Sequence, residues 1–136
     1  MHHTLGIATH GPGLVEITNE VADWLAQHSV QHGLLTLFCR HTSASLLIQE
    51  NADPSVLRDL QRFFERIAPH AKGLWEHDAE GPDDMPAHVR AALTQTSLSI
   101  PIISGRMALG TWQGVYVFEH RDRPHRREIV LMLTRA

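Results

Sequence analysis

The segment that decides the fold runs from residue 33 to residue 41 and reads Gly33-Leu34-Leu35-Thr36-Leu37-Phe38-Cys39-Arg40-His41. After the glycine, apolar residues occupy both odd and even positions. Strands with two apolar faces are typical of a central position in a sheet. We therefore predict a central strand over residues 34–40 that is covered on both faces.

Signals for strands and helices follow one another irregularly on either side of this segment. Strands are predicted over 3–9, 46–50, 97–103, 115–120 and 128–134, the second as a continuation or neighbour of the central strand. A first helix is predicted to run from the cap Thr18 to about His28. A second begins at Pro54, after the cap Asp53, and ends before Pro69. A third runs from Pro86 to about Leu93, with Asp84 or Met85 as its cap. This mixture favours an α+β fold with an extensive mixed or antiparallel sheet over a doubly wound one. The length fits a single domain over 1–136.

Composition narrows the class of protein. An apolar fraction of 43% is enough for a real core, and no apolar run approaches the roughly 18 residues of a membrane span. The N-terminus lacks the pattern of a signal peptide, and Cys39 is the only cysteine. We expect a cytoplasmic protein with no membrane association. A net charge of -3 argues against nucleic acid as a partner.

Three polar residues fall on apolar strand faces. Alternation places His41 on the face of Leu35 and Leu37, Glu119 on the face of Val117, and Glu50 on the face of Leu46 and Ile48. A lone histidine in such a place is more often a satisfied core residue than a ligand. A carboxylate there must be paired, protonated or metal-bound.

The long loop over 70–84 is a functional suspect because it is rich in charge, glycine and proline. His77 in this loop and His88 after it are eleven residues apart, which matches no named metal motif. Trp112 and Gln113 lie between two glycines, and this pattern predicts either a tight turn or a platform that contacts a ligand. An arginine cluster near the C-terminus suits surface charge or a phosphate group and comprises Arg121, Arg123, Arg126 and Arg127. Phosphate-binding, dinucleotide-binding and nucleophile-elbow motifs are absent.

Taken together, several motifs in this order resemble the YjbQ family along essentially the whole chain. They are His41-Thr42-Ser43-Ala44-Ser45-Leu46, Glu50-Asn51-Ala52-Asp53-Pro54, His77 to His88, Gly105-Arg106, Gly110-Thr111-Trp112-Gln113-Gly114 and Glu119-His120-Arg121. The resemblance implies a compact α+β domain, usually a homotrimer. It also implies a weak thiamine-phosphate synthase (transferase) activity that joins a thiazole phosphate to a pyrimidine diphosphate.

The resemblance also implies that His41, His77 and His88, with acidic residues near them, belong to the active site. We therefore expect catalytic roles for His41, His77, His88, Asp78 and Glu119. We expect the substrate to be bound by Ser43, Asn51, Arg106, Trp112, Gln113, Arg121 and Arg123. We predict that His41, His77 and His88 converge on a divalent ion, with Glu119, Asp78 and Asp84 as orienting carboxylates. Three imidazoles suit Zn²⁺ or another transition metal, whereas loop carboxylates suit Mg²⁺. The alternatives are a metal-free acid–base site, a non-catalytic metal- or small-ligand-binding trimer, or a metal-assisted hydrolase.

Overall fold

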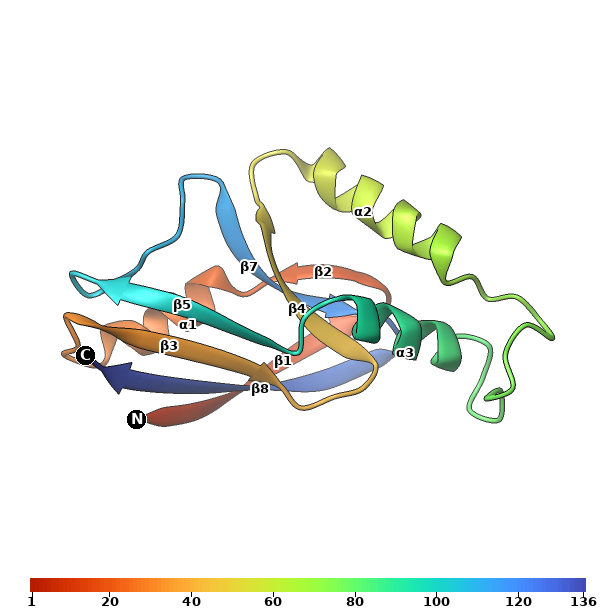
Figure 1. The fold of residues 1–136 in the computed structure, drawn as a ribbon, viewed down its shortest axis with the longest axis horizontal. Helices are drawn as coiled ribbons and strands as arrows, with labels where there is room; N and C mark the ends of the chain where they lie inside the picture. The colour runs from red at the N-terminus through yellow and green to blue at the C-terminus, as the bar shows by residue number, and fades with distance from the viewer.

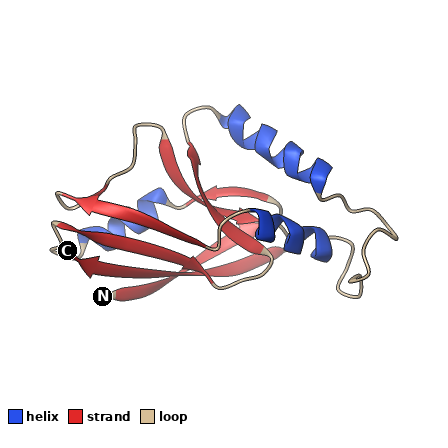
Figure 2. Cartoon of the chain, viewed as in Figure 1, coloured by secondary structure: helices blue, strands red, loops and turns tan.

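In the computed structural model, which describes residues 1–136, two antiparallel sheets and three helices form an α+β fold (Figures 1 and 2). The fold class predicted from the sequence is confirmed. In chain order the elements are β1 (His2–His10), β2 (Gly13–Glu16), α1 (Thr18–Ala26), β3 (His32–Cys39), β4 (Ala44–Glu50), α2 (Pro54–Ile67), α3 (Asp84–Leu93), β5 (Ser97–Ile103), β6 (Arg106–Met107), β7 (Gln113–Glu119) and β8 (Pro124–Arg135).

The larger sheet has the strand order β1-β8-β3-β5-β6, and the smaller one has the order β2-β7-β4. β3 pairs with β8 on one side and with β5 on the other, so its predicted central position is confirmed. The strand predicted over 46–50 is β4, which pairs with β7 and thus belongs to the second sheet. The short strands β2 and β6 were not predicted, because four and two residues are too few for a periodic signal.

The two faces of β3 differ. Leu35, Leu37 and Cys39 are buried, whereas Leu34 and Phe38 are 43% and 47% exposed. The prediction that both faces are covered is therefore wrong for this chain by itself. The physical reason is that the core of 19 buried apolar residues lies on one side of the larger sheet, against the second sheet and α1.

The helix ends follow local hydrogen bonding. At α2 the prediction is confirmed, because the Asp53 carboxylate accepts the Ser55 N–H at 2.9 Å and Pro54 opens the helix. At α1 the predicted cap is wrong: Ile17 holds the cap position, and the Thr18 hydroxyl instead accepts the Val115 N–H at 2.9 Å. α3 begins at Asp84, two residues before the predicted start.

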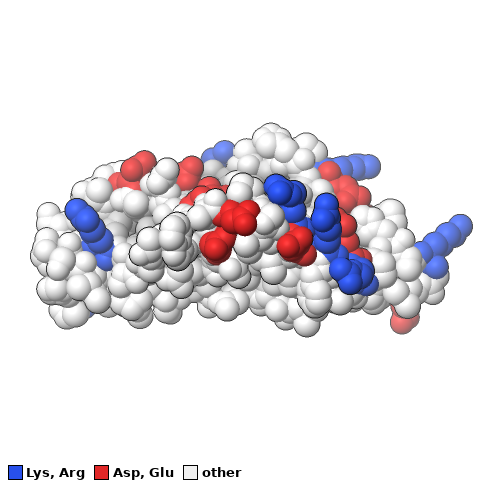
Figure 3. Space-filling view, turned by 90° about the horizontal axis from the view of Figure 1, so that it is seen from above, with Lys and Arg blue, Asp and Glu red and all other residues white.

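One end of the molecule gathers segments that are distant in sequence. The turn after β3, the start of α3 and the turn between β7 and β8 lie together on the right of Figure 1, beside the loop over 70–83. The face seen in Figure 3 carries acidic and basic side chains interspersed. None of the helices combines the length and apolar character needed to cross a membrane.

Candidate metal centre

His77, Asp84 and His88 converge at this end of the molecule. Asp84 and His88 are four residues apart in α3, so one helical turn places them on the same face. The loop before α3 brings His77 to the same carboxylate oxygen. Asp84 Oδ2 lies 2.7 Å from His77 Nε2 and 3.2 Å from His88 Nε2, and the three ligand atoms all lie within 4.8 Å of one another.

Arg121 holds the Asp84 carboxylate in this orientation. Its Nη1 donates to Asp84 Oδ1 at 2.7 Å, while its Nε donates to Asp83 Oδ2 at 2.8 Å. Burial alone would raise the pKa of Asp84, but the hydrogen bond from His77 and the nearby cationic groups outweigh it, so the pKa lies below its usual value. Asp84 is therefore an anion with one oxygen satisfied by arginine and the other turned to two imidazoles.

The tautomer of His88 follows from its other contact. His88 Nδ1 lies 3.1 Å from the Thr42 carbonyl oxygen, which can only accept, so Nδ1 carries the hydrogen. In neutral His88 the Nε2 lone pair then faces the Asp84 carboxylate. Two acceptors this close require a cation between them, either a proton or a metal ion. A second contact that fixes the tautomer in this way is characteristic of metal-binding histidines.

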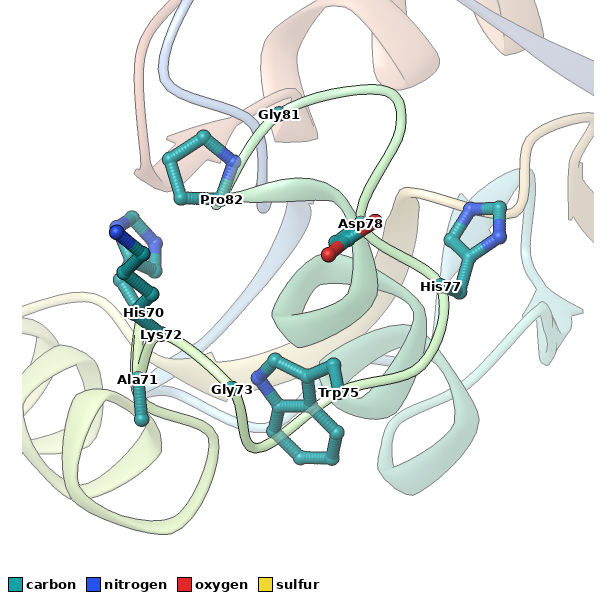
Figure 4. Close-up of a pocket in the computed structure, with 9 residues that line it drawn as sticks. All are labelled: His70, Ala71, Lys72, Gly73, Trp75, His77, Asp78, Gly81 and Pro82. Atoms are coloured by element: carbon teal, nitrogen blue, oxygen red, sulfur yellow. The ribbon is translucent and has the colours of Figure 1, made fainter.

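The cluster is open to solvent on one side. The His77 and His88 side chains are 50% and 31% exposed, whereas Asp84 is only 2% exposed. A cavity of about 310 Å³ lies within the adjoining loop, where Trp75 is fixed by a hydrogen bond to the Pro69 carbonyl (Figure 4). His77 borders this cavity, with its ring directed away from the cavity centre, and the Asp78 side chain lines it.

His41 lies outside the cluster. Its Nε2 accepts the Glu128 N–H at 2.8 Å, and burial, aided by the charge of Arg127, lowers its pKa. Within one chain the structure thus unites two of the three predicted metal-binding histidines and supplies Asp84 as the third group. The reason is that the chain turns after β3 so that the Thr42 carbonyl faces α3, while the His41 ring faces β8.

Glu119 is also placed elsewhere, in the interior. It is completely buried and accepts hydrogen bonds from Arg127 Nε at 2.7 Å and from the Thr9 hydroxyl at 2.5 Å. Of the three alternatives for a carboxylate on this face, namely paired, protonated or metal-bound, the structure shows the paired one. Burial raises the pKa of Glu119, but the bonds from Arg127 and Thr9 more than reverse this, so the net pKa is lowered.

The residues predicted to bind substrate are spread over the molecule. Arg121 is bound to the acidic pair, and Ser43 accepts from Arg127. The turn with Trp112 and Gln113 lies at the opposite end of β7 from Glu119, about 20 Å along the strand. Asn51 adjoins that turn through its backbone, while Arg106 is exposed in β6 and Arg123 is exposed in the turn after β7. The single chain does not bring these side chains together around the histidines.

Sequence reasoning missed a buried polar network around His120, the residue that precedes Arg121. His120 is completely buried and shares a 2.9 Å hydrogen bond with Ser45, which in turn accepts from Thr94 at 2.5 Å. Strand alternation puts His120 on the face opposite Glu119, which would be solvent-exposed in a two-layer fold. α2 covers that face, as the edge contact between Phe64 and Phe118 shows, with ring centroids 5.3 Å apart.

The class of protein is defined by this fold and by comparison with known proteins. Residues 3–136 match the family described as UPF0047 protein YjbQ-like. The chain is 53% identical to a UPF0047 protein of Synechocystis over 93% of this chain and 86% of that one. It is 44% identical to UPF0047 protein YjbQ of Escherichia coli O157:H7 over 96% and 94% of the two chains.

Solved structures agree with the sequence matches. A YjbQ/UPF0047 family protein from Clostridium acetobutylicum superposes with a TM-score of 0.86 at 34% identity, covering 98% of this chain and 99% of that one. A conserved hypothetical protein from Thermus thermophilus gives a TM-score of 0.86 at 36% identity, covering 97% and 99%. The chain belongs to the YjbQ (UPF0047) family.

Proposed function

We propose that this protein is a metal-dependent enzyme that acts on a small phosphorylated molecule. The observation that carries the proposal is the single Asp84 oxygen that faces both His77 and His88 within hydrogen-bonding distance. Around a tetrahedral zinc ion, donor atoms lie about 3.3 Å apart. The His88 nitrogen, at 3.2 Å from this oxygen, already has that spacing. The His77 nitrogen, at 2.7 Å, is closer than two ligands of one ion would be, so the half-exposed His77 ring would move outward to admit it.

The chemistry of the donors favours a transition metal over Mg²⁺. Two imidazole nitrogens and one carboxylate oxygen suit Zn²⁺ and its neighbours, whereas Mg²⁺ prefers oxygen alone. Three protein ligands leave one coordination position open, which is the arrangement of catalytic sites. A bound ion there would supply Lewis-acid stabilisation to a phosphate or pyrophosphate group. Arg121 would hold Asp84 in place, and the Thr42 carbonyl would fix the His88 tautomer.

The reaction to test first is the one that the family resemblance implies. Thiamine-phosphate formation joins a thiazole phosphate to a pyrimidine diphosphate and releases pyrophosphate, whose charge must be neutralised. The exposed side of the cluster and the cavity beside it support a small substrate. A metal-free acid–base site is the second candidate, favoured by the 2.7 Å pairing of His77 with Asp84.

The test combines elemental analysis with activity, on protein purified without a polyhistidine tag. We expect about one equivalent of a transition metal per chain, loss of thiamine-phosphate formation on chelation and its return with metal. His77→Ala and His88→Ala should each lower both metal content and rate, while His2→Ala, an exposed histidine at the far end of β1, should change neither.

Each alternative has its own outcome. The metal-free acid–base site would be supported by three results together. The protein would contain less than about one-tenth equivalent of metal, its activity would not change on adding a chelator, and that activity would be lost in His77→Ala. Full metal content with no turnover of these substrates, or of simple phosphate esters, would instead indicate a binding protein.

A further inference from the structure

Arg90 of α3 is a buried cation whose hydrogen-bonding capacity is largely unused. The residue is only 3% exposed, and its Nη2 donates to the Ala68 carbonyl at 2.9 Å. Its Nε is buried without a partner, and no carboxylate lies within ion-pairing distance. A guanidinium has five N–H donors, and an unpaired charge is costly to bury. Burial accordingly lowers the pKa of Arg90.

A recess of about 260 Å³ opens beside this guanidinium, separate from the histidine cluster. It lies where α2 and α3 face the turns that follow β1 and β7, and Pro12 and Pro69 form part of its wall. Gln61 of α2 also lines it, and the Gln61 Oε1 is buried without a partner. The recess thus contains an unmet donor and an unmet acceptor.

The charges around the recess have both signs. Glu65 of α2 and Asp122 after β7 line it, and both favour the charged form of Arg90 through space without contacting it. His70 also lines the recess, with its Nδ1 4.0 Å from Asp122 Oδ2. A simple anion would satisfy Arg90 but would meet two carboxylates. A simple cation would satisfy the carboxylates and leave Arg90 unpaired. A molecule with both charges satisfies all of these groups.

We propose that this recess binds a small zwitterion, such as an amino acid or an aminoalkyl phosphate. Its carboxylate or phosphate pairs with Arg90, and its ammonium group lies between Glu65 and Asp122. Gln61 Oε1 accepts one of the ammonium hydrogens. Guanidinium is the side chain best suited to hold such an oxyanion through paired hydrogen bonds. This inference stands apart from the proposed metal chemistry, because none of the three metal-binding groups lines the recess.

The test is an NMR titration of isotope-labelled full-length protein, observed at the Arg90 Nε–H and the Gln61 amide. The probes are each of the standard amino acids and 2-aminoethyl phosphate, with acetate, inorganic phosphate and ethylamine as probes of a single charge. At least one zwitterion should move both signals and bind at least about tenfold more tightly than every single-charge probe. The proposal is overturned if no zwitterion moves the Arg90 signal, or if the single-charge probes bind equally well.

Variants separate binding from a merely structural role of the arginine. Arg90→Lys keeps the positive charge but removes the paired N–H donors of the guanidinium, so the affinity for the zwitterion should fall at least about tenfold. Glu65 is exposed, so Glu65→Gln should leave the fold intact. This substitution should weaken binding of the zwitterion about two- to fivefold, because it removes the attraction of Glu65 for the ammonium group. It should strengthen binding of inorganic phosphate, because it removes the repulsion between Glu65 and the anion. Glu20→Gln, on the exposed surface of α1, should change neither. Equal effects of Glu65→Gln on both probes would contradict the proposed orientation.

Discussion

Arg127 Nε donates to Glu119 Oε1 at 2.7 Å in a pair of which neither side chain is more than 5% exposed. The pair joins β7 to β8 and also holds the Ser43 hydroxyl and carbonyl. A buried ion pair is weak evidence for net stability, but removing one partner leaves the other as an unpaired charge in the interior.

Arg127→Met should therefore destabilise the protein by about 3–5 kcal/mol, because Glu119 loses its countercharge in the interior. Urea unfolding followed by circular dichroism measures this. Arg123→Met, an exposed member of the same arginine cluster, should have little effect. Combining Glu119→Leu with Arg127→Met should restore much of the stability, and a double variant as unstable as Arg127→Met would count against the stranded-charge explanation.

Stability should also fall in acid because of His120. Burial, followed by the charge of Arg90, lowers the pKa of His120 from 6.5 to about 3. Between these pH values the unfolded chain binds a proton that the folded chain does not, so acid favours unfolding. We expect a slope of about 1.4 kcal/mol per pH unit from this residue across the window.

Comparison with His120→Gln isolates this contribution from that of the carboxylates. The difference in unfolding free energy between the two proteins should shrink steadily as the pH is lowered from about 6.5 toward 3. A difference that stays constant over this range would show that His120 titrates normally. The exposed His2→Gln serves as the matched control.

The single-chain geometry predicts unequal roles for the histidines. His41→Ala should leave the metal content of the protein unchanged, because the His41 ring binds the Glu128 N–H rather than the cluster. His88→Ala should reduce it strongly. Mass spectrometry of the elements in both variants is the measurement, and equal loss of metal would show that His41 reaches the ion from another chain.

Arg121 should act on the metal through Asp84. Arg121→Met frees the carboxylate to rotate, and we expect metal affinity to fall about 10- to 100-fold, as for other groups that orient a ligand. Competition with a chromophoric chelator gives the affinity. Arg123→Met, two residues along the same turn, should leave it unchanged; a similar loss there would point to general electrostatics.

The exposed face of the larger sheet predicts self-association. Leu34, Phe38, Ile103 and Met132 are each 43–56% exposed on β3, β5 and β8. The trimer that the family resemblance implies would have a mass of 3 × 15.3 kDa, about 46 kDa. Light scattering should give this value for the wild type, and Phe38→Asp should lower it while Leu74→Asp, in the exposed loop, should not. A wild-type mass near 15 kDa would exclude the trimer.

Local patterns were enough to place most of the elements. The cap at Asp53 and the alternation along residues 97–103 depend on neighbours in the chain, so they can be read without a structure. The hydrogen bond of Thr18 could not be predicted in this way, because its hydroxyl accepts the N–H of Val115, which lies in a strand 97 residues away. Contacts of this kind depend on sheet pairing, which a periodic pattern does not specify.

The candidate site likewise combines features that depend on neighbouring residues with contacts between distant segments. By itself, the sequence determined that His88 lies in a short helix after the loop over 70–84, and that Glu119 must be paired, protonated or metal-bound, because its strand face is apolar. Only the tertiary structure showed that the helix already begins at Asp84, which places Asp84 and His88 on one face. Only the tertiary structure decided that His77 joins Asp84, that His41 turns to Glu128 and that the partner of Glu119 is Arg127. These contacts depend on the path of a loop, the turn after β3 and the register between strands, which are fixed by packing over the whole domain.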